Sequence, residues 1–353
     1  MTDRLDALQA ELERWAVAHY SGLTTSGAVS VHGLETMPGH AGLSFGFRVM
    51  RDSTVLDDLV MRVPPKGVRR SGNTDVLRQV PLLRALAAHG VPVAPIVWWD
   101  ADEQWFEVPY LMAGRVAGDT WNVRGAAAVD VEAATAAAKG VFRQAVETLA
   151  LIHAVPWRDG LADWEPVKEL TAEVVFWDKL LDKAADPAWA DAGRVVRDLL
   201  LQSVPANPTV GVFHGDFQTN NILYHDGTLQ AVIDWEISGI GAQLLDLGWL
   251  LMMNDPLSWF DGEGLSIVPP FDQIVAWYSS AIGYEVTLHD VAWYRALSGY
   301  RFGVISCFNV MLHRTGKRVD AEWDRIAPSV EYLFGRAKSL LDSGASGAIS
   351  SVG

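Results

Sequence analysis

The sequence predicts an α+β protein with a strand-rich N-terminal lobe and a mainly helical C-terminal lobe. Between residues 26 and 116, short runs rich in β-branched and aromatic residues alternate with turn residues, which is typical of strands. From residue 117 to residue 342, apolar residues recur at helical spacing in most segments. The chain has 353 residues, of which 50% are hydrophobic, and this is enough for about two domains with large cores.

The N-terminal lobe is expected to be an antiparallel sheet with one helix. A separate helix within residues 1–25 precedes it, because Leu8, Leu12 and Trp15 recur every three or four positions. The expected strands cover residues 29–34, 45–50, 58–63, 93–99 and 105–112. The one helix of the lobe is expected at residues 76–89.

The C-terminal lobe is expected to be helical apart from one hairpin. Its expected helices cover residues 133–153, 170–181, 189–201, 244–253, 271–282 and 289–313. The last of them opens with the capping pattern Thr287-x-x-Asp290. The segment 343–353 is rich in glycine and serine, which predicts a disordered tail.

Composition and charge exclude several classes of protein. The 43 acidic residues outnumber the 28 basic ones, and a formal charge of −15 argues against nucleic-acid binding, which needs a basic surface. The apolar run 247–253 is too short to cross a bilayer, so no membrane partner is expected. The single cysteine, Cys307, cannot form an intrachain disulfide and fits a reducing compartment. We therefore expect a cytoplasmic protein.

The most informative stretch runs from Phe213 to Leu247. In it, His214-Gly215-Asp216 is followed by Asn221 and then by Asp234. An Asp-Gly turn between two apolar runs predicts a β-hairpin between Asn221 and Asp234. Such a hairpin would bring the backbones of Asn221 and Asp234 to within about 5 Å, close enough for an amide oxygen and a carboxylate to bind one Mg²⁺. Asp216 could then accept the proton of an attacking hydroxyl.

This stretch resembles the catalytic core of the aminoglycoside phosphotransferase and choline kinase-like family, whose pattern is HGDxxxxN, a hydrophobic strand and IDWE. It is similar above all to the branch associated with acyl-CoA dehydrogenases. Metallophosphoesterases also contain Gly-Asp pairs, but they need further histidine and aspartate ligands that are missing from this sequence. The resemblance implies a two-lobed protein-kinase-like fold that uses ATP, or GTP, with Mg²⁺. It implies that Asp216 is catalytic and that Asn221 and Asp234 bind the metal.

The resemblance also implies nucleotide-binding residues in the N-terminal lobe. Arg62 matches the basic residue of a family strand that pairs with the nucleotide phosphates, and an arginine can bind phosphate with two parallel hydrogen bonds. The family usually has a glutamate on the following helix as its acidic partner, and this chain has Gln79 there. A glutamine could still accept a hydrogen bond from the guanidinium.

Two further segments are expected to contact the nucleotide. The loop 38–46 should cover the phosphates through Gly42 and the hydroxyl of Ser44, since glycine permits close backbone approach. The adenine should meet the connection between the lobes through backbone groups of Met112, Ala113 and Gly114.

Other motif residues are expected to support the site. Asp246 should accept hydrogen bonds from the catalytic-loop backbone, and His214 should fix the same loop. Glu236 has three open interpretations, which are a group beside the metal, a substrate contact and a solvated loop acid. The segment 241–243 reads Gly-Ala-Gln where the family often has Gly-Asp-Pro, so this chain departs from the pattern there.

The sequence predicts a small-molecule phosphotransferase and leaves its hydroxyl-bearing acceptor open. An aminoglycoside-like antibiotic, a hydroxyacyl compound and a choline-like alcohol all remain candidates, and the acidic loop around Asp255, Asp261 and Glu263 could recognise a cationic one. A protein kinase is disfavoured because its Gly-rich, HRD, DFG and APE patterns are missing. The alternative is a catalytically weak, nucleotide-binding pseudokinase, which Gln79 would favour.

Overall fold

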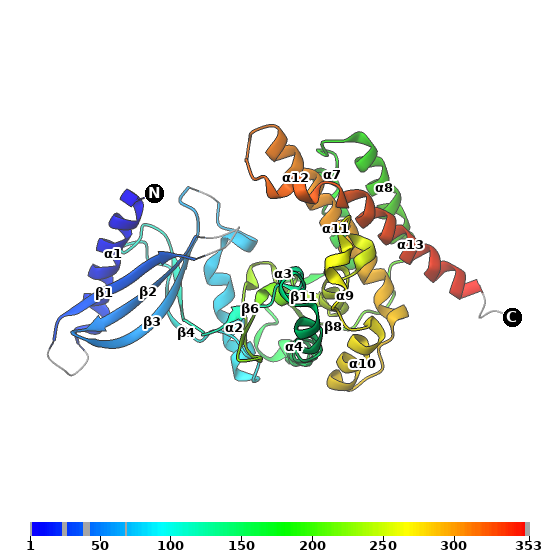
Figure 1. Cartoon of the computed structure of the whole chain (residues 1–353). Coiled ribbons are helices and arrows are strands. Elements are labelled where there is room, and N and C mark those ends of the chain that lie inside the picture. The colour runs from blue at the N-terminus through cyan, green and yellow to red at the C-terminus, as the bar shows by residue number, and fades with distance from the viewer. Residues whose placement is uncertain (1, 23–26, 38–42, 68, 350–353) are drawn as a thin grey trace. The chain divides into compact units, whose positions relative to one another are not determined.

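The computed structural model describes residues 2–22, 27–37, 43–67 and 69–349 (Figure 1). The chain divides into two compact units. Unit 1 contains Met1–Gly118, Arg158–Trp164 and Gln230–Ile237, and unit 2 contains the rest. Two short segments that the sequence reading assigns to the C-terminal lobe, around Trp164 and Asp234, therefore belong to unit 1.

Unit 1 is built on a five-stranded antiparallel sheet with the strand order β1-β2-β3-β5-β4. The strands are β1 (Val29–Thr36), β2 (Leu43–Arg51), β3 (Thr54–Val63), β4 (Ile96–Asp100) and β5 (Tyr110–Gly114). The strand expected at residues 105–112 begins later, because Asp100 and Asp102 accept hydrogen bonds from the backbone two residues on and Glu107 has a φ of 59°. Such turns prevent strand pairing before Tyr110.

The N-terminal helix α1 (Thr2–Tyr20) packs onto this sheet and is part of unit 1. Its Leu12 and Trp15 are fully buried in a core that includes Phe47 and Met112. The Trp15 indole N–H donates to the Tyr110 hydroxyl over 3.0 Å. The sequence predicts this helix as a separate N-terminal segment. In the structure it packs onto the sheet, where its apolar face is buried.

The helix of unit 1 is shorter than expected. A 3₁₀ turn, η2 (Val76–Arg78), precedes α2 (Gln79–Ala88). Pro81 lies in the first turn of α2, where the N–H that proline lacks has no helical partner. Asp75 caps the preceding turn by accepting from the Leu77 N–H at 3.1 Å.

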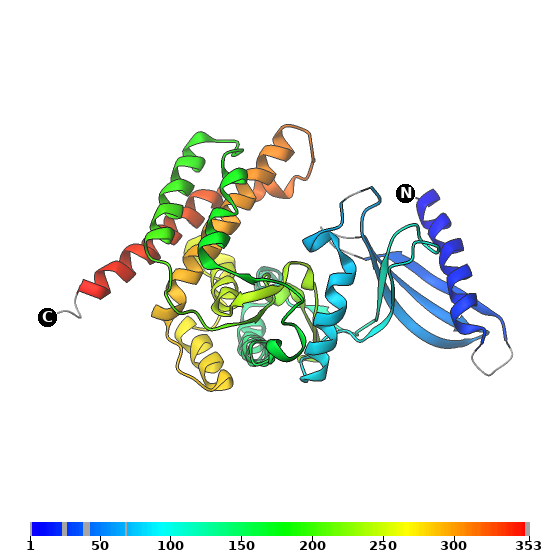
Figure 2. The same ribbon diagram turned by 180° about the vertical axis from the view of Figure 1, so that it is seen from behind.

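Unit 2 is mainly helical, as the sequence predicts. Its helices are α3 (Val123–Val129), α4 (Val131–His153), α6 (Leu170–Val175), α7 (Asp178–Leu181), α8 (Pro187–Gln202), α9 (Leu244–Met253), α10 (Phe271–Ile282), α11 (Leu288–Arg314), α12 (Glu322–Ile326) and α13 (Ser329–Ile349). Helix α11 packs against α8, α9 and α13, as both views show (Figures 1 and 2). The reciprocal capping box of Thr287 and Asp290 starts α11. Burial of Cys307 in this core raises the pKa of its thiol to about 12.

Two expectations for unit 2 are wrong in part. The single helix expected at residues 170–181 is divided into α6 and α7. The segment 343–349, expected to be disordered, continues α13. A helix extends easily once its first turns, which are the costly ones, have formed. In α13 the buried side chains of Val330, Leu333 and Phe334 stabilise those first turns.

The predicted hairpin forms from β9 (Ile222–His225) and β10 (Thr228–Val232). Asp226 and Gly227 at its turn have φ angles of 48° and 72°, which is the combination that a type I′ turn requires. The Gln144 side chain of α4 donates to the Gly227 carbonyl and accepts from the Leu229 N–H, both over 2.9 Å. Short β6 (Asp119–Thr120) pairs with β9.

A second small sheet leads into the catalytic motif. Its strand order is β7 (Val167–Lys168), β11 (Gly239–Ala242) and β8 (Val210–Phe213). Strand β8 ends where His214 begins the motif. In the part of the chain that the structure describes, the helices are too short or too polar to span a membrane.

We predict that Trp15→Ala lowers the free energy of unfolding by about 3–5 kcal/mol, because it removes a large buried side chain and leaves a cavity. Val17→Ala on the same helix is the control, since Val17 is 47% exposed and should change stability by no more than about 0.5 kcal/mol. Urea denaturation of both variants measures the difference. Equal stability of the two variants would show that α1 does not stabilise unit 1.

Candidate active site

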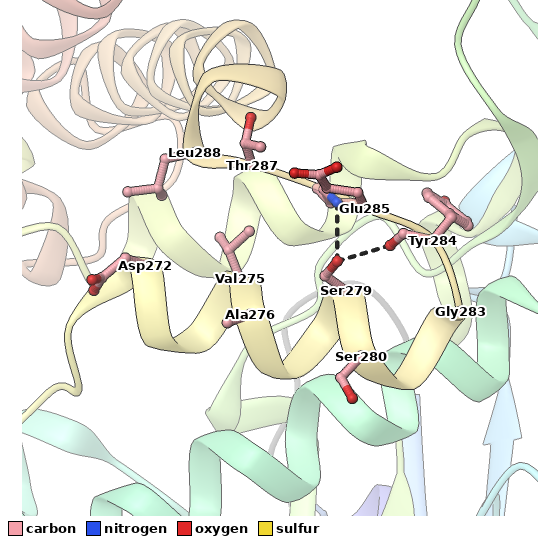
Figure 3. A pocket seen from close by; sticks show the side chains of 11 residues that line it. Asp272, Val275, Ala276, Ser279, Ser280, Gly283, Tyr284, Glu285, Thr287 and Leu288 are labelled. Atoms are coloured by element: carbon pink, nitrogen blue, oxygen red, sulfur yellow. Dashed lines mark hydrogen bonds between the residues drawn. The ribbon is translucent and has the colours of Figure 1, made fainter.

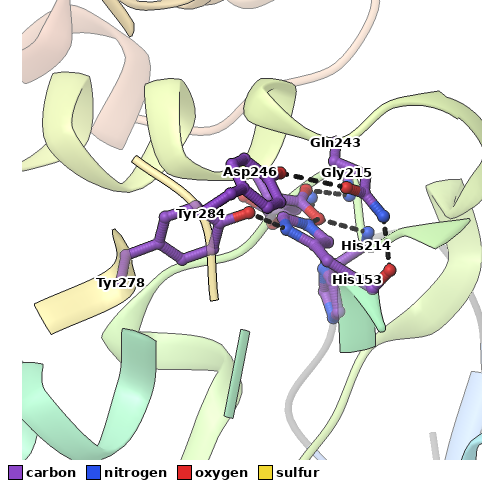
Figure 4. Close-up of polar contacts among 8 residues, drawn as sticks. His153, His214, Gly215, Gln243, Asp246, Tyr278 and Tyr284 are labelled. Atoms are coloured by element: carbon purple, nitrogen blue, oxygen red, sulfur yellow. Dashed lines mark hydrogen bonds and ion pairs between the residues drawn. The ribbon is translucent and has the colours of Figure 1, made fainter. Parts of the chain in front are cut away.

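The loop that carries Asp216 is held by one buried carboxylate. Asp246, in the first turn of α9, is fully buried and accepts hydrogen bonds from the backbone N–H groups of His214 and Gly215, each over 2.7 Å (Figure 4). Gly215 has a φ of 88°, which favours glycine at this position. The ring Nδ1 of His214 accepts from the Asp216 N–H at 3.2 Å. These bonds fix the backbone on both sides of Gly215.

A buried polar network surrounds Asp246. His153 Nε2 lies 3.3 Å from Asp246, and His153 Nδ1 lies 2.7 Å from the Tyr278 hydroxyl (Figure 4). Burial raises the pKa of Tyr278, so its hydroxyl keeps its proton. Gln243 donates to the His153 carbonyl, and the Tyr284 hydroxyl lies 3.5 Å from Gln243 Oε1. Sequence reasoning missed Tyr278 and Gln243 as members of this network, although the departure at residues 241–243 marked the position.

Asp216 lies in a nest of hydrogen-bond donors. Its Oδ1 accepts from Trp249 Nε1 at 2.6 Å and from Gln218 Nε2 at 2.7 Å, and its Oδ2 accepts from Asn221 Nδ2 at 2.9 Å. Burial raises the pKa of Asp216 above its ordinary value, while His214 and Arg301 act in the opposite direction. A raised pKa makes this carboxylate a better proton acceptor. No local pattern in the sequence marks Trp249 as a partner of Asp216.

Asn221 is oriented by the same loop. Its Nδ2 donates to the backbone carbonyl of Asp216 as well as to the side chain, both over 2.9 Å. Both donors of the amide are thereby directed at Asp216, which leaves the amide oxygen for another partner. An oxygen of this kind is a suitable ligand for a hard cation.

Arg62 faces two carboxylates in unit 1. It lies on β3, and its Nη2 pairs with Asp234 Oδ1 at 3.4 Å and also with Glu236. The Arg62 side chain is 19% exposed, the Asp234 side chain 44%. Burial lowers the pKa of Arg62, and the charge of Asp234 opposes this shift. Glu236 is only 7% exposed, so the solvated-loop interpretation of this residue is wrong.

Asp234 has an unusual backbone. Its φ is 67°, in a region that residues other than glycine seldom adopt. It lies two residues after the end of β10 and directly before the 3₁₀ turn η4 (Trp235–Ile237). The Trp235 indole donates to the Val232 carbonyl at 2.9 Å. Backbone strain of this kind often accompanies functional positions.

The other residues expected at the nucleotide differ in their relation to Arg62. Gln79 is buried at the start of α2, and the described residues contain no hydrogen bond between it and Arg62. Ser44 lies opposite Arg62 in the pairing of β2 with β3. Gly42 lies outside the described residues.

The expected nucleotide hinge lies at the end of β5 and stays a prediction. Met112, Ala113 and Gly114 lie within β5, which is hydrogen-bonded to β3 on one side and to β4 on the other. Met112 is also fully buried. A strand in the interior of a sheet uses its backbone groups for pairing, so a nucleotide base would have to meet backbone beyond Gly114.

Two of the three acids in the acidic loop are already paired with arginines. Asp255 is buried and pairs with Arg295 at 2.7 Å and with Arg336 at 2.8 Å. Asp261 pairs with Arg124 at 2.9 Å. These contacts weaken the idea that this loop binds a cationic acceptor.

A surface pocket of about 750 Å³ lies along α10 and the loop that follows it (Figure 3). Ser279 fixes this loop, because its hydroxyl donates to the Tyr284 carbonyl at 2.8 Å and accepts from the Val286 N–H at 3.0 Å. The residues that line the pocket include Asp272 and Glu285 but none of the predicted site residues.

The amide oxygen of Asn221 and the carboxylate of Asp234 are chemically suited to bind a hard divalent cation. Asn221 belongs to unit 2 and Asp234 to unit 1, so their joint metal site stays a prediction. The described part of the chain contains no group of three or more histidine, cysteine, aspartate and glutamate side chains that could hold a metal. An amide oxygen and one carboxylate, completed by phosphate oxygens and water, are a typical magnesium environment in phosphoryl transfer.

A family model of phosphotransferase enzymes matches residues 38–280. The chain belongs to this phosphotransferase enzyme family. It is thus a kinase-type phosphotransferase. Among curated relatives, acyl-CoA dehydrogenase family member 11 of Gallus gallus is 26% identical over 260 residues, which are 70% of this chain and 33% of the relative. The chain therefore spans about a third of the length of that relative.

Solved structures share the fold. A Ralstonia eutropha JMP134 protein assigned as an aminoglycoside phosphotransferase has a TM-score of 0.71 at 22% identity, over 94% of this chain and 98% of that one. The complex of APH(2")-IIia with GDP and kanamycin has a TM-score of 0.63 at 16% identity, over 93% and 98% of the two chains. At these identities the likeness establishes the kinase-like fold alone.

We predict that Asp246→Asn lowers the free energy of unfolding by about 2–4 kcal/mol, because an amide cannot accept hydrogen bonds through both of its ends and a buried donor loses its partner. Asp226→Asn at the exposed hairpin turn is the control and should stay within about 0.5 kcal/mol, since asparagine tolerates a positive φ. Chemical denaturation followed by circular dichroism checks both. A loss below 1 kcal/mol in Asp246→Asn would contradict the anchoring role.

Proposed function

We propose that this protein transfers the γ-phosphoryl group of ATP, or of GTP, to an alcohol hydroxyl with the help of Mg²⁺. The observation that carries the proposal is the setting of Asp216, a half-buried carboxylate on a loop whose backbone is anchored to Asp246. Family membership supports the reaction type. Support for a nucleotide comes from the similar structure that contains GDP.

Each motif residue has one role in the proposed reaction. Asp216 positions the acceptor hydroxyl and takes its proton as the oxygen attacks the γ-phosphorus, while the bond from that phosphorus to the departing nucleoside diphosphate breaks. Asn221 and Asp234 would hold Mg²⁺, which would neutralise developing charge on the phosphates. Arg62 binds phosphate oxygens in the nucleotide-bound state.

The acceptor is proposed to carry its hydroxyl on an apolar or anionic body. Trp249 and Arg301 lie next to Asp216. The guanidinium of Arg301 stands 4.5 Å over the Trp249 ring and 5.4 Å over the Trp177 ring. Arg301 also donates to the Gly215 carbonyl at 2.9 Å. Aromatic rings and a cation suit a hydroxyacyl compound better than a polycationic aminoglycoside. A choline-like alcohol is intermediate, since its ammonium group could stack on the rings.

A catalytically weak, nucleotide-binding protein is the second candidate. Gln79, without hydrogen bond to Arg62 in the described residues, is the observation that favours it. The pairing of Arg62 with Glu236 weakens this alternative, because the arginine has an acidic partner from another segment.

We predict that Asp216→Ala reduces turnover by at least about 100-fold and leaves nucleotide affinity within a few-fold of the original, since a missing general base affects the chemical step. Release of nucleoside diphosphate measures turnover, and calorimetric titration with a non-hydrolysable ATP analogue measures binding. The control is Asp226→Asn, which should leave both unchanged. Undiminished turnover in Asp216→Ala would exclude Asp216 as the base.

We predict that Asp261→Asn changes kcat/KM for the acceptor by less than about twofold, because the Asp261 side chain is 67% exposed and already paired with Arg124. Steady-state kinetics with a hydroxyacyl compound, choline and an aminoglycoside as acceptors test this. A loss of tenfold or more with the aminoglycoside alone would instead place a cationic acceptor at the loop.

A further inference from the structure

We propose that Glu236 is a positioning residue that replaces the helix glutamate missing at Gln79, and that it leaves Asp234 free for a divalent cation by neutralising Arg62. This inference rests on the proposed function only in taking Asp234 as a metal ligand. It assigns one role to a residue for which the sequence left three. It also explains why a chain with Gln79 can retain a buried arginine on β3.

Arg62 stands between two carboxylates that differ in exposure. The same nitrogen, Nη2, faces Asp234 Oδ1 at 3.4 Å and Glu236 Oε1. Glu236 is nearly buried, whereas the Asp234 side chain is 44% exposed. A buried carboxylate needs a permanent counter-ion, while an exposed one can exchange its partner for a metal ion. Arg62 is the cation that the structure provides for Glu236.

The backbone at Glu236 is fixed by other segments of unit 1. Arg78 Nη1 donates to the Glu236 carbonyl at 3.3 Å. The guanidinium of Arg78 stacks 4.6 Å from the centre of the Trp164 ring, and the indole N–H of Trp164 donates to the Arg78 carbonyl at 2.8 Å. Arg78 is next to Gln79 in sequence. The segment in which the family usually has a glutamate therefore holds the backbone of Glu236 in this chain. Glu236 is therefore held at two points, because Arg62 pairs with its carboxylate and Arg78 donates to its backbone carbonyl.

Removal of the charge at Glu236 should redirect Arg62. With glutamine at position 236, the only carboxylate that faces Arg62 in the described contacts is Asp234. A full ion pair would then form there, and a divalent cation would have to displace the guanidinium to bind. The expected sign is weaker metal binding, and its cause is Arg62 rather than the loss of a ligand.

The test measures Mn²⁺ binding without nucleotide by water proton relaxation, so it does not depend on turnover. We expect Glu236→Gln to weaken Mn²⁺ binding roughly tenfold, because a charge-assisted hydrogen bond now competes for Asp234. The double variant Arg62→Met with Glu236→Gln removes the competitor and should restore the affinity to within about threefold of the original protein. Replacing both members of a buried pair also preserves folding better than replacing one.

Glu107→Gln is the matched control, because it removes one negative charge from unit 1 at an exposed pair with Lys66 and should change Mn²⁺ affinity by less than about twofold. Unchanged Mn²⁺ affinity in Glu236→Gln overturns the proposal. Weakened affinity that the double variant does not restore also overturns it, since Glu236 would then act as a ligand itself. A protein that shows the expected Mn²⁺ pattern but transfers no phosphoryl group would contradict the proposed function alone.

Discussion

Two short hydrogen bonds to the buried carboxylate of Asp246 determine the geometry of the catalytic loop. Both oxygens of Asp246 accept hydrogen bonds from backbone N–H groups of the loop. A shift of the loop would therefore leave the buried Asp246 carboxylate without these donors. Asp216 follows directly, and its own carboxylate is oriented by Trp249, Gln218 and Asn221. The proposed base is thus fixed from two sides, by its backbone and by its donors. Preorganisation of this kind is what phosphoryl transfer requires of a protein, since little covalent chemistry is left for it to do.

In unit 1, Arg62 lies largely buried on β3, and its charge needs a partner. The resemblance to the family predicts an acidic partner for this arginine at the start of α2, where this chain has the uncharged Gln79. Glu236 supplies the charge from the segment after the hairpin. The metal ligand proposed in the same segment, Asp234, then lies beside the arginine that is proposed to bind phosphate. A single stretch of chain therefore couples the proposed phosphate-binding and metal-binding groups of unit 1.

The parts of the fold that depend on local chemistry were predictable. The Asp226-Gly227 turn, the capping box at Thr287 and the helical repeat of α11 are all set by residues close in sequence. The order of motif residues also indicated the reaction class. By contrast, the partner of Arg62 comes from a segment far along the chain, and no local pattern reports such pairing. The end of β5 at Gly114, beside the expected hinge, is likewise set by pairing with β3 and β4 rather than by local sequence. Helix α13 continues into the segment expected to be disordered because its packed first turns support a composition that would be weak alone.

The central claim is that Asp216 directs a phosphoryl group to an organic hydroxyl. The most direct measurement follows the label of γ-³²P-ATP in the presence of Mg²⁺ and a mixture of hydroxyacyl, choline-like and aminoglycoside acceptors, with chromatographic separation of organic and inorganic phosphate. We expect the label to enter an organic phosphate with the original protein and this product to be lost in Asp216→Ala. Label found only in inorganic phosphate, at the same rate in both proteins, would contradict it.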